Sequence, residues 1–386
     1  MKILYIAHSA ELQGSGIALL NILKMITQKN ITPVVLLPAY GTISDSLKKQ
    51  NIKFYVIKYY NETYPHLKNC RDYILFLPRI LRTFFFNIKA KNFLSKVIEL
   101  EHPDIIHTNT GVLLFPEKIA RKYNIPHVWH AREFLMKGSQ YCTFGGLKRI
   151  KDRYHSKNNH CIAITRSIFE FYNLDFNKDC IIYDGVFSET SKLDKPTDEK
   201  IKDQEYFLYV GSLDYGKGIY DVIESFNQFY KLGFHTELWL AGNDSENVMQ
   251  YLSNLPCKGK VRYLGFRKDI YSLMQNAKAL IVASYNEGFG FITAEAMYNK
   301  CLVIGRNVSG TKEQFENGKR FTEHEVALKF TTVPELVALL LKVQRQGKAT
   351  FNQMIEHGYK TVTHFYTIEE SVDKLSLFYK RVSKNE

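Results

Sequence analysis

The stretch YNEGFGFITAE, residues 285–295, contains two glutamates, Glu287 and Glu295, on either side of a Gly-Phe-Gly turn. Carboxylates accept hydrogen bonds from hydroxyl groups, and glycines such as Gly288 and Gly290 let the backbone turn sharply and come close to a ligand. Backbone amides at the start of a following helix favour negative charge. The alternative is an ordinary glycine turn before a helix that carries a solvated glutamate. Other segments of the chain must distinguish a ligand-binding turn from a purely structural one.

Three further loops at expected strand ends carry residues suited to related chemistry. HSAELQGSG places Gly14 and Gly16 before a helix, an amide-rich turn suited to a phosphate. In YVGSLDYGKG, Lys217 stands between two glycines where a helix begins, and such a lysine is a good phosphate ligand unless it is simply solvated. HVWHAREF ends a strand in His130, which is either a catalytic group or a structural one.

The first glycine loop does not fit a nicotinamide dinucleotide site. That fingerprint needs a third glycine near the helix start and an acidic residue after the second strand. Here Ile17, Ala18 and Leu19 follow Gly16, and the second strand ends in LLPAY. The loop therefore favours a different phosphate-bearing ligand or a closely approaching substrate.

The elements that must position these loops alternate between strand and helix along the chain. Short apolar β-prone runs separated by helical patterns predict βαβ units with a parallel sheet covered on both faces. These runs are KILYIA, TPVVLLP, KFYVIK, DIIHTN, HVWHA and CIAIT, then YFLYVG, TELWLAG, VRYLG, ALIVAS and CLVIG. The pattern predicts an α/β protein made of two doubly wound domains.

A polar segment without apolar periodicity separates the two halves. We expect an N-terminal domain over 1–186, a linker over 187–205 and a C-terminal domain over 206–365. Residues 366–386 form an amphipathic helix that we expect to pack back on the N-terminal domain. Because ligands of open α/β sheets bind at the carboxyl ends of the strands, we expect a cleft between two facing domains to hold the site.

Composition limits the classes of protein that the chain can represent. Its 386 residues exceed the size of a usual single core, and 45% hydrophobic residues fit a globular protein. The six cysteines lack metal-ligand spacing, and no apolar run is long enough for a signal peptide or a membrane span, so we expect a cytoplasmic protein with reduced thiols. The net charge of +13 calls for anionic partners such as phosphates, lipid headgroups or nucleic acid.

The order and spacing of these segments resemble the retaining GT-B glycosyltransferases of the family 4 type. EGFGFITAE looks like the E-x7-E motif of that family. The likeness runs over nearly the whole chain, through the glycine loop, His130, VGSLDYGKG, VRYLGFRKDIYSLMQNAKALIVAS and SGTKEQFENG. The resemblance implies the GT-B fold, in which two Rossmann-like domains face each other across a cleft, and a nucleotide sugar as the donor.

The resemblance also implies a role for each matching residue. Glu287 would face the donor sugar and Glu295 would bind the ribose diol, while His130 would lie near the reacting sugar. Lys217 would neutralise the diphosphate, which the glycine turns approach with their amides. The implied catalytic residues are His130 and Glu287, and the implied substrate-binding residues are Gly14, Gly16, Ser212, Lys217, Glu287, Gly288, Phe289, Gly290 and Glu295.

Three positions depart from the family pattern. Ser212 stands where the family usually has Arg, so one diphosphate cation is missing. We expect either that Lys217 carries more of the leaving-group stabilisation or that Arg267 or Arg306 substitutes for the missing arginine. Lys300 replaces the usual glycine after the E-x7-E helix, which predicts a different helix end. Asp184 replaces the common Asn before Gly185, which we interpret as a change of turn only.

These observations predict a metal-independent retaining glycosyltransferase that needs no cofactor. It would move a sugar from a nucleoside-diphosphate donor to an acceptor hydroxyl, with the departing diphosphate accepting the acceptor's proton. No D-x-D metal motif stands on a loop, so Lys217 and helix dipoles would replace a divalent cation. The alternatives are a GT-B-like sugar-nucleotide epimerase and a non-catalytic nucleotide-sugar binding protein. Nucleic acid is not expected as a partner, because no recognition motif is present.

The acceptor side is predicted from residues 67–96, where basic residues, among them Lys68, alternate with aromatic ones. Together with a second basic stretch, interpreted as a loop over 145–160, this indicates an anionic membrane surface as a partner. We expect a glycan or lipid-linked acceptor at the inner face of the cell membrane, as in bacterial surface polysaccharide synthesis. The alternative is a helix with core phenylalanines and solvated lysines.

Overall fold

The structure is a computed structural model of the chain. It describes residues 1–12, 14–65, 67, 70–135, 141–143, 146–190 and 204–384. The chain forms two compact units: unit 1 is Met1–Ser188 together with Ile368–Glu386, and unit 2 is Glu189–Thr367. Of the segment expected to be a linker, residues 191–203 lie outside the described part, as does Lys68.

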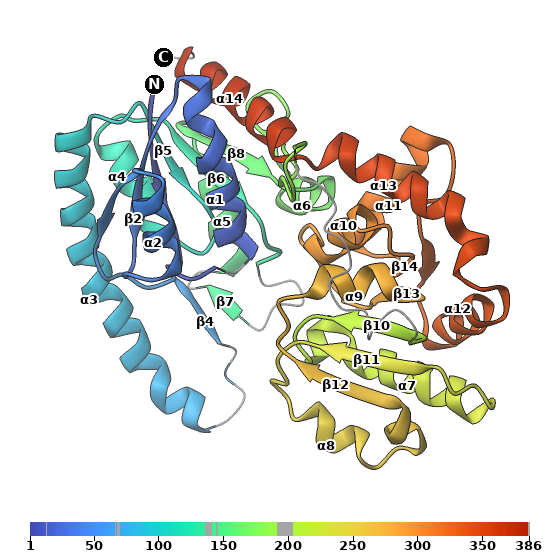
Figure 1. The fold of residues 1–386 in the computed structure, drawn as a ribbon. Helices are drawn as coiled ribbons and strands as arrows, with labels where there is room; N and C mark the ends of the chain where they lie inside the picture. The colour runs from blue at the N-terminus through green and yellow to red at the C-terminus, as the bar shows by residue number, and fades with distance from the viewer. Residues whose placement is uncertain are drawn as a thin grey trace. The chain divides into compact units, whose positions relative to one another are not determined.

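Unit 1 is built on a parallel seven-stranded sheet in the order β3-β2-β1-β5-β6-β8-β9 (Figure 1). Its strands are β1 (Lys2–Ile6), β2 (Thr32–Leu37), β3 (Lys53–Val56), β5 (Ile105–Thr108), β6 (His127–Ala131), β8 (Asn159–Ala163) and β9 (Cys180–Ile181). A separate antiparallel ribbon pairs β4 (Thr63–Pro65) with β7 (Tyr141–Thr143). Its helices are α1 (Gly14–Ile26), η1 (Thr27–Lys29), α2 (Thr42–Lys49), α3 (Cys70–Glu101), α4 (Phe115–Lys122), α5 (Gly146–Tyr154), α6 (Arg166–Tyr172) and α14 (Ile368–Lys384).

Two hydrophobic layers cover the two faces of this sheet, because successive side chains of a strand point to opposite faces. On β1, Ile3 and Tyr5 pack with α1, α2 and α14, while Leu4 and Ile6 pack with α3 and α4. Strands β1 and β2 are apolar on both faces of the sheet, as expected of a parallel sheet between helices.

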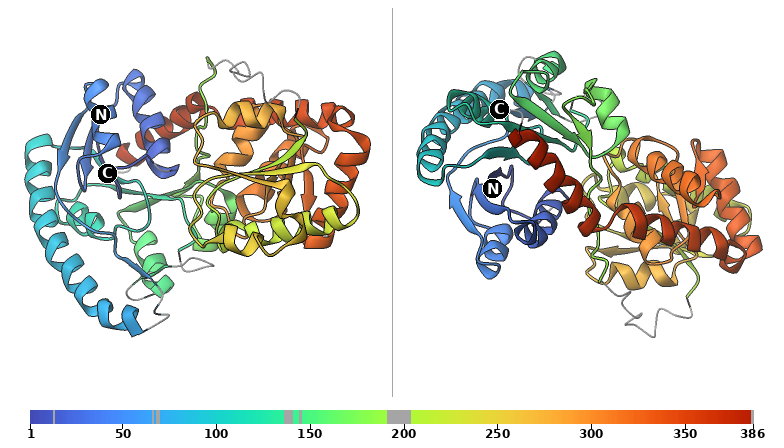
Figure 2. Two further views of the ribbon diagram at one scale, coloured as in Figure 1. Left: turned by 60° about the horizontal axis from the view of Figure 1, so that its bottom comes forward. Right: turned by 90° about the horizontal axis from the view of Figure 1, so that it is seen from above.

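Unit 2 is a second parallel sheet, of six strands, in the order β12-β11-β10-β13-β14-β15. Its strands are β10 (Tyr206–Val210), β11 (Glu237–Ala241), β12 (Val261–Gly265), β13 (Ala279–Val282), β14 (Val303–Arg306) and β15 (Leu328–Phe330). Its helices are η3 (Tyr215–Lys217), α7 (Ile219–Lys231), α8 (Val248–Leu252), η4 (Pro256–Lys260), α9 (Ile270–Asn276), α10 (Phe291–Tyr298), α11 (Ser309–Thr322), α12 (Val333–Gln346), η5 (Lys348–Phe351) and α13 (Asn352–Phe365). Helices lie on both faces of the sheet (Figure 2).

Local sequence signals explain where several helices begin. Thr332 caps α12 in a reciprocal capping box with Glu335, and Thr165 caps α6 by accepting from the Ile168 amide. Asp214 accepts from the Lys217 amide at 3.0 Å and so fixes the start of η3. These caps place the loops that follow β8, β10 and β15 at the carboxyl ends of their strands.

The structure confirms the predicted fold class, two Rossmann-like α/β units in tandem. One local expectation was wrong: the basic stretch 145–160 is not a loop, because residues 146–154 form α5 and β8 begins at Asn159. Ile150 and Tyr154 give α5 a buried side, which the many lysines and arginines of this stretch obscured. All six cysteines are free thiols, and no described helix is both long and apolar enough to cross a bilayer.

Candidate functional site

The candidate site of unit 2 lies where the strand order of its sheet reverses. From β10 the chain proceeds outward through β11 and β12, then returns to β13 on the other side of β10. The loops after β10 and β13 therefore separate at the carboxyl ends of two adjacent parallel strands, which is where open α/β sheets bind ligands. Lys217 lies in the first loop and Glu287 in the second.

Close backbone packing joins these two loops. The Tyr285 amide donates to the Gly216 carbonyl at 3.1 Å. Gly218 has a φ of 71°, and a Cβ added there would lie 2.1 Å from the carbonyl oxygen of Ala283. Only glycine fits this position, because both the left-handed backbone and the lack of space exclude a side chain.

Lys217 and Glu287 form an ion pair. The Lys217 Nζ lies 2.6 Å from Glu287 Oε1, and Ser284 Oγ donates to the same oxygen at 2.8 Å. The Lys217 side chain is 41% exposed and the Glu287 side chain 15%, so solvent and a ligand can reach the lysine more readily. A cation and a carboxylate thus lie side by side at the carboxyl ends of β10 and β13.

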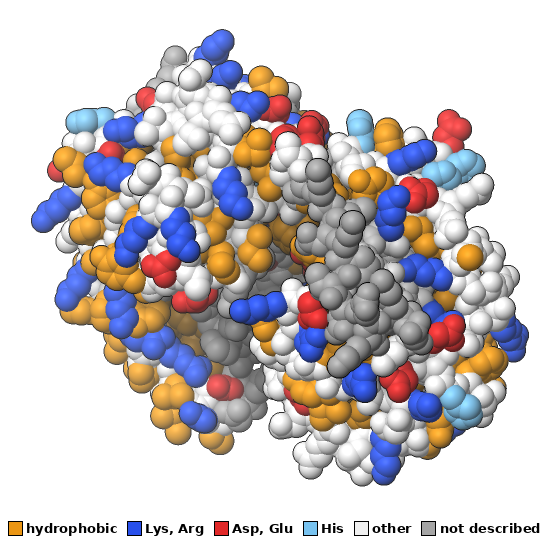
Figure 3. All heavy atoms as spheres, viewed as in Figure 1, with side chains coloured by type: hydrophobic (Ala, Val, Ile, Leu, Met, Phe, Trp, Pro, Cys, Tyr) orange, Lys and Arg blue, Asp and Glu red, His pale blue; other side chains and the backbone are white. Residues whose placement is uncertain are grey.

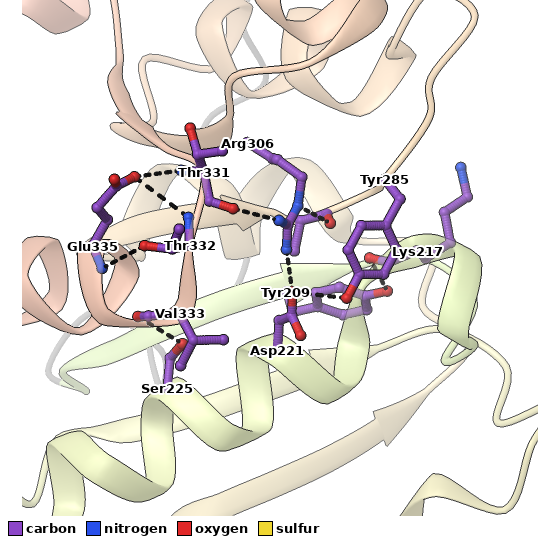
Figure 4. Close-up of polar contacts among 11 residues, drawn as sticks. Tyr209, Lys217, Asp221, Ser225, Tyr285, Arg306, Thr331, Thr332, Val333 and Glu335 are labelled. Atoms are coloured by element: carbon purple, nitrogen blue, oxygen red, sulfur yellow. Dashed lines mark hydrogen bonds and ion pairs between the residues drawn. The ribbon is translucent and has the colours of Figure 1, made fainter. Parts of the chain in front are cut away.

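A buried arginine fixes the strand end that leads into this loop (Figure 4). Arg306 donates from Nε to the Ala283 carbonyl at 2.9 Å and from Nη1 to the Thr331 carbonyl at 2.8 Å, and it pairs with the Asp221 carboxylate. Its guanidinium lies 4.5 Å from the ring centroid of Tyr285, whose hydroxyl donates to Asp221 at 2.9 Å. Burial, and then this hydrogen bond, raise the pKa of Tyr285 to about 12.

This network corrects one expectation. Arg306 was a candidate for the missing diphosphate cation, but its side chain is 9% exposed and its donors serve two carbonyls and Asp221. Arg306 therefore stabilises the conformation of the loop after β13. The other candidate, Arg267, is 37% exposed and pairs with Asp269, with Nε 2.8 Å from Oδ1.

Helix α11 holds the glycine turn at 288–290 from behind. Gln314 Nε2 donates to the carbonyls of Phe289 at 2.7 Å and Gly290 at 3.0 Å, and the Gly310 amide donates to the Glu287 carbonyl at 3.0 Å. These hydrogen bonds fix the turn that leads into α10. The first amides of a helix generally lack intrahelical partners, and a helix start favours an anion.

Glu295 lies one turn into α10 and contacts the hydroxyl of Tyr271, at 3.3 Å from Oε1. Burial raises the pKa of this carboxyl group, and the Tyr271 hydroxyl partly opposes the shift. Within the described part of the chain Glu295 has no ion-pair partner. Its oxygens can therefore accept hydrogen bonds from hydroxyl groups of a ligand.

The end of α10 differs from the expectation drawn from Lys300. Helix α10 ends at Tyr298, and Lys300 adopts a left-handed φ of 52°, the conformation that a glycine would favour. The Cys301 amide then donates to the Ala296 carbonyl at 2.9 Å. The usual end geometry is thus kept without glycine, at the cost of backbone strain.

A pocket of about 260 Å³ lies at the carboxyl ends of β10 and β11. Ser212 and Arg267 line it, together with Phe266, which is 73% exposed, and Ile270. Tyr271, the partner of Glu295, follows Ile270 on α9, so one helix links the pocket to α10. No cluster of three or more His, Cys, Asp or Glu side chains able to hold a metal occurs among the described residues.

Three predicted site residues belong to unit 1. His130 is 2% exposed; its Nδ1 lies 3.3 Å from His107 Nε2 and 3.2 Å from Arg132. His107 contacts the Tyr379 hydroxyl of α14 at 2.5 Å. Burial, aided by the Arg132 charge, lowers the pKa of His130 well below its usual range, so the imidazole is neutral. The catalytic role of His130 stays a prediction.

The interpretation of Asp184 as a simple turn residue was wrong. Its carboxylate is buried and forms an ion pair with Arg132, which also donates from Nε to the Asn109 carbonyl at 2.9 Å. A buried charge needs such a partner, so the aspartate is required where an asparagine would leave Arg132 unpaired. Through Arg132, Asp184 therefore helps to position His130.

The first glycine loop also differs in detail. Gly14 and Gly16 form the first turn of α1 instead of preceding it. A Cβ on Gly16 would lie 2.7 Å from the Glu11 carbonyl, whereas one on Gly14 would meet nothing within 4 Å. Gly16 is thus needed for close packing of the preceding loop, and its contact with a ligand stays a prediction.

Comparison with known proteins finds a match for the second unit. The model of the family described as Glycosyl transferases group 1 matches residues 191–361, which is less than half of the chain. Lys217, Glu287, the glycine turn and Glu295 all lie within the matched residues.

A curated relative matches part of the chain, and solved structures resemble the fold of the whole chain. The capsular polysaccharide biosynthesis glycosyltransferase CapM of Staphylococcus aureus is 26% identical over 137 residues, which is 34% of this chain and 35% of CapM. The match thus spans about a third of that relative. The structure of Anabaena Alr3699/HepE in complex with UDP is similar with a TM-score of 0.77 at 17% identity, covering 99% of this chain and 100% of that one. WaaG, a glycosyltransferase involved in lipopolysaccharide biosynthesis, gives a TM-score of 0.67 at 14% identity, with 97% and 99% covered. These likenesses show the GT-B fold.

Sequence reasoning missed the residues that hold the site loops of unit 2 in place. Asp221 and Gln314 stand far along the chain from the residues they contact, and no spacing pattern signals such pairs. Tyr271 was missed for the same reason. The one usable signal was the position of Asp221 in the first turn of the helix after Lys217, where an acidic residue is ordinarily explained by the helix dipole.

Proposed function

We propose that the chain is a retaining glycosyltransferase that moves a sugar from a nucleoside-diphosphate donor to an acceptor hydroxyl. The observation that carries the proposal is the Lys217–Glu287 pair beside the glycine turn and the α10 start. The pair lies at the strand reversal of the sheet of unit 2, within the residues that the group 1 family model matches. This arrangement supplies a cation and amides for a diphosphate and a carboxylate for sugar hydroxyls. Glu295 supplies a second carboxylate, for the ribose diol.

The pocket that Ser212 and Arg267 line suits the base of the nucleotide. Its volume of about 260 Å³, its apolar wall and the exposed ring of Phe266 fit a flat heterocycle, and it lies next to the helix that leads to Glu295. Uracil is the first base to test, because similar solved structures contain UDP and UDP-glucose. Arg267 is then the residue placed to approach the phosphates in place of an arginine at Ser212.

Binding of a diphosphate gives the ion pair a function in the reaction. Lys217 turns from Glu287 to the diphosphate, and Glu287 becomes available to the donor sugar. The bond between the anomeric carbon and the diphosphate oxygen breaks, the acceptor oxygen bonds to the same face, and its proton passes to the departing diphosphate. Lys217 and the α10 dipole stabilise the charge of the leaving group without a divalent cation. Neutral His130 positions the reacting sugar.

The acceptor in this proposal is a lipid-linked glycan at the inner face of the cell membrane. The name of CapM, capsular polysaccharide biosynthesis glycosyltransferase, and the lipopolysaccharide association of WaaG support surface polysaccharide synthesis as the setting.

The test incubates the purified chain with UDP-glucose and other nucleoside-diphosphate sugars, with EDTA, in the presence and absence of lipid-linked and soluble glycan acceptors. Transfer requires donor consumption that depends on the acceptor and a product whose anomeric configuration equals that of the donor. Epimer formation without acceptor would identify an epimerase. Donor binding without any turnover would identify a non-catalytic binding protein, and activity only with a divalent cation would overturn metal independence.

A further inference from the structure

The longest helix of unit 1, α3, exposes a stripe of large hydrophobic side chains. Six of them, between 54% and 73% exposed, define what we call the outer face of α3: Tyr73, Ile74, Leu77, Leu81, Phe84 and Phe85. Their spacing of three and four residues places them on one side of the helix. We propose that the outer face of α3 binds the surface of an anionic lipid bilayer.

The packing of α3 shows why this stripe is not part of the core. Its buried residues start only at Thr83, so the first half of the helix packs little against the sheet. Three other aromatic residues face inward: Phe76 packs on Tyr64 of the β4–β7 ribbon, Phe86 on Tyr60, and Phe93 on Tyr55. The aromatic residues of α3 thus form two sets. The inner set packs the helix against the rest of unit 1, and the outer set does not contribute to the core.

Basic side chains run along one flank of the outer face. Arg71, Arg82, Lys89 and Lys96 are exposed and follow one another at spacings of eleven, seven and seven residues, which are close to whole numbers of turns. The ammonium group of Lys89 lies 4.3 Å from the ring centroid of Phe85, so its stem covers apolar surface while its charge faces outward. Figure 3 shows basic side chains among hydrophobic ones along the edge of unit 1 where α3 runs.

Charge complementarity selects an anionic membrane as the occupant of this face. Over residues 70–96 the helix has six basic residues and one acidic residue, Asp72, which lies 3.8 Å from Arg79. A second copy of the same face would bring like charges together, whereas anionic headgroups neutralise them and the hydrocarbon boundary accepts the aromatic and aliphatic side chains. Because α3 is too charged to cross a bilayer, it would lie in the plane of the interface.

This inference does not depend on the proposed transfer reaction, because it concerns α3 alone and is measured without donor or acceptor. The experiment is co-sedimentation of the full chain with phosphatidylcholine vesicles, with and without phosphatidylglycerol, at low and high salt. Wild type should co-sediment only with the anionic vesicles, and less at high salt. Removal of one engaged basic side chain should lower partitioning by about fivefold.

Three variants locate the binding surface. Replacing Arg71, Arg82, Lys89 and Lys96 by Gln should reduce partitioning at least tenfold, and L77Q/L81Q/F84Q should reduce it even at low salt. The control replaces four exposed lysines on other helices, Lys24, Lys49, Lys231 and Lys380, by Gln, with the same change in charge. Thermal melting and UDP binding report on folding and on unit 2, and all three variants should resemble wild type in both.

Each contrary outcome overturns the inference. An equal loss in the control would mean that net charge, and not α3, drives binding. Equal recovery on neutral and anionic vesicles would remove the charge argument. The wild type could instead form a dimer in analytical ultracentrifugation, fail to bind vesicles, and become monomeric in L77Q/L81Q/F84Q. That result would mean that a second copy of the chain, and not a membrane, covers the outer face of α3.

Discussion

Lys217 and Glu287 form an ion pair, at 2.6 Å between Nζ and Oε1. In the proposed reaction a diphosphate competes with Glu287 for the lysine, so the pair should lower the affinity for free diphosphate. Ser284 donates to the same Glu287 oxygen and should hold that carboxylate in place when the lysine moves.

The first prediction concerns the cation. In the K217A variant, loss of a charge-assisted contact worth about 1.5–3 kcal/mol should lower kcat/KM roughly ten- to a hundredfold. Glu287 then also repels the diphosphate, so K217A/E287Q should bind UDP more tightly than K217A in calorimetry. K231A, which changes an exposed lysine at the end of α7, is the matched control and should behave as wild type. A folded K217A with an unchanged rate would remove Lys217 from the mechanism.

The second prediction separates the two glutamates. E295A should weaken UDP binding, because the ribose diol loses its acceptor, while E287A should keep or increase UDP affinity and lose turnover, because it frees Lys217 but removes the sugar contact. Calorimetry with UDP and initial rates with the full donor measure the two effects. If E287A lost more UDP affinity than E295A, the two roles would have to be exchanged.

At the scale of elements, the site depends on how closely two strand-to-helix loops pack. Gly218 lets the loop after β10 lie against Ala283 at the end of β13, and Arg306 with Asp221 holds the same strand end from the other side. Lys217 and Glu287 lie close together because the backbones of the two loops that carry them pack in direct contact.

The third prediction tests this packing. A left-handed backbone costs an alanine about 1–2 kcal/mol, and G218A adds a clash with a backbone oxygen at 2.1 Å. G233A is the matched control, since Gly233 has a φ of 88° with nothing within 4 Å of its Cβ position. G218A should therefore melt at a lower temperature than G233A and bind UDP more weakly, while G233A binds UDP normally. Equal effects in the two variants would mean that the contact with Ala283 does not position the site.

At the scale of the whole molecule, the chain leaves unit 1, builds unit 2 and returns to unit 1 with α14. Ile368, Val372, Leu375 and Phe378 of α14 belong to the same core as β1 and α1. Tyr379 reaches His107, which contacts His130, so the end of the chain also completes the buried cluster of unit 1.

The fourth prediction follows from this return. L375A removes a side chain that is 1% exposed and should destabilise unit 1 by about 2–5 kcal/mol. L377A, at a position 64% exposed on the same helix, should be close to neutral. Hydrogen exchange read by mass spectrometry should show lost protection in β1 and α1 of L375A, with the strands of unit 2 unchanged. Equal loss of protection in both units would show that they unfold as one.

The sequence by itself determined the strands of the two parallel sheets and marked Lys217 and Glu287 as candidate site residues of the second unit. Apolar runs and their spacing fix the two sheets, because buried parallel strands need continuous apolar residues, and the glycines and charges around Lys217 and Glu287 mark strand ends. Local patterns of this kind are carried by neighbouring residues, so they can be read without a structure.

The tertiary structure alone decided which of those residues contact one another. It paired Lys217 with Glu287 and Asp184 with Arg132, made Arg306 a brace instead of a phosphate ligand, and divided the aromatic residues of α3 between core and surface. These outcomes depend on contacts between segments far apart in the chain and on the side of a helix that faces the sheet. Charge and hydrophobicity along the sequence do not specify such contacts, because the same residue type is stable in a buried pair or in solvent, depending on its neighbours in space.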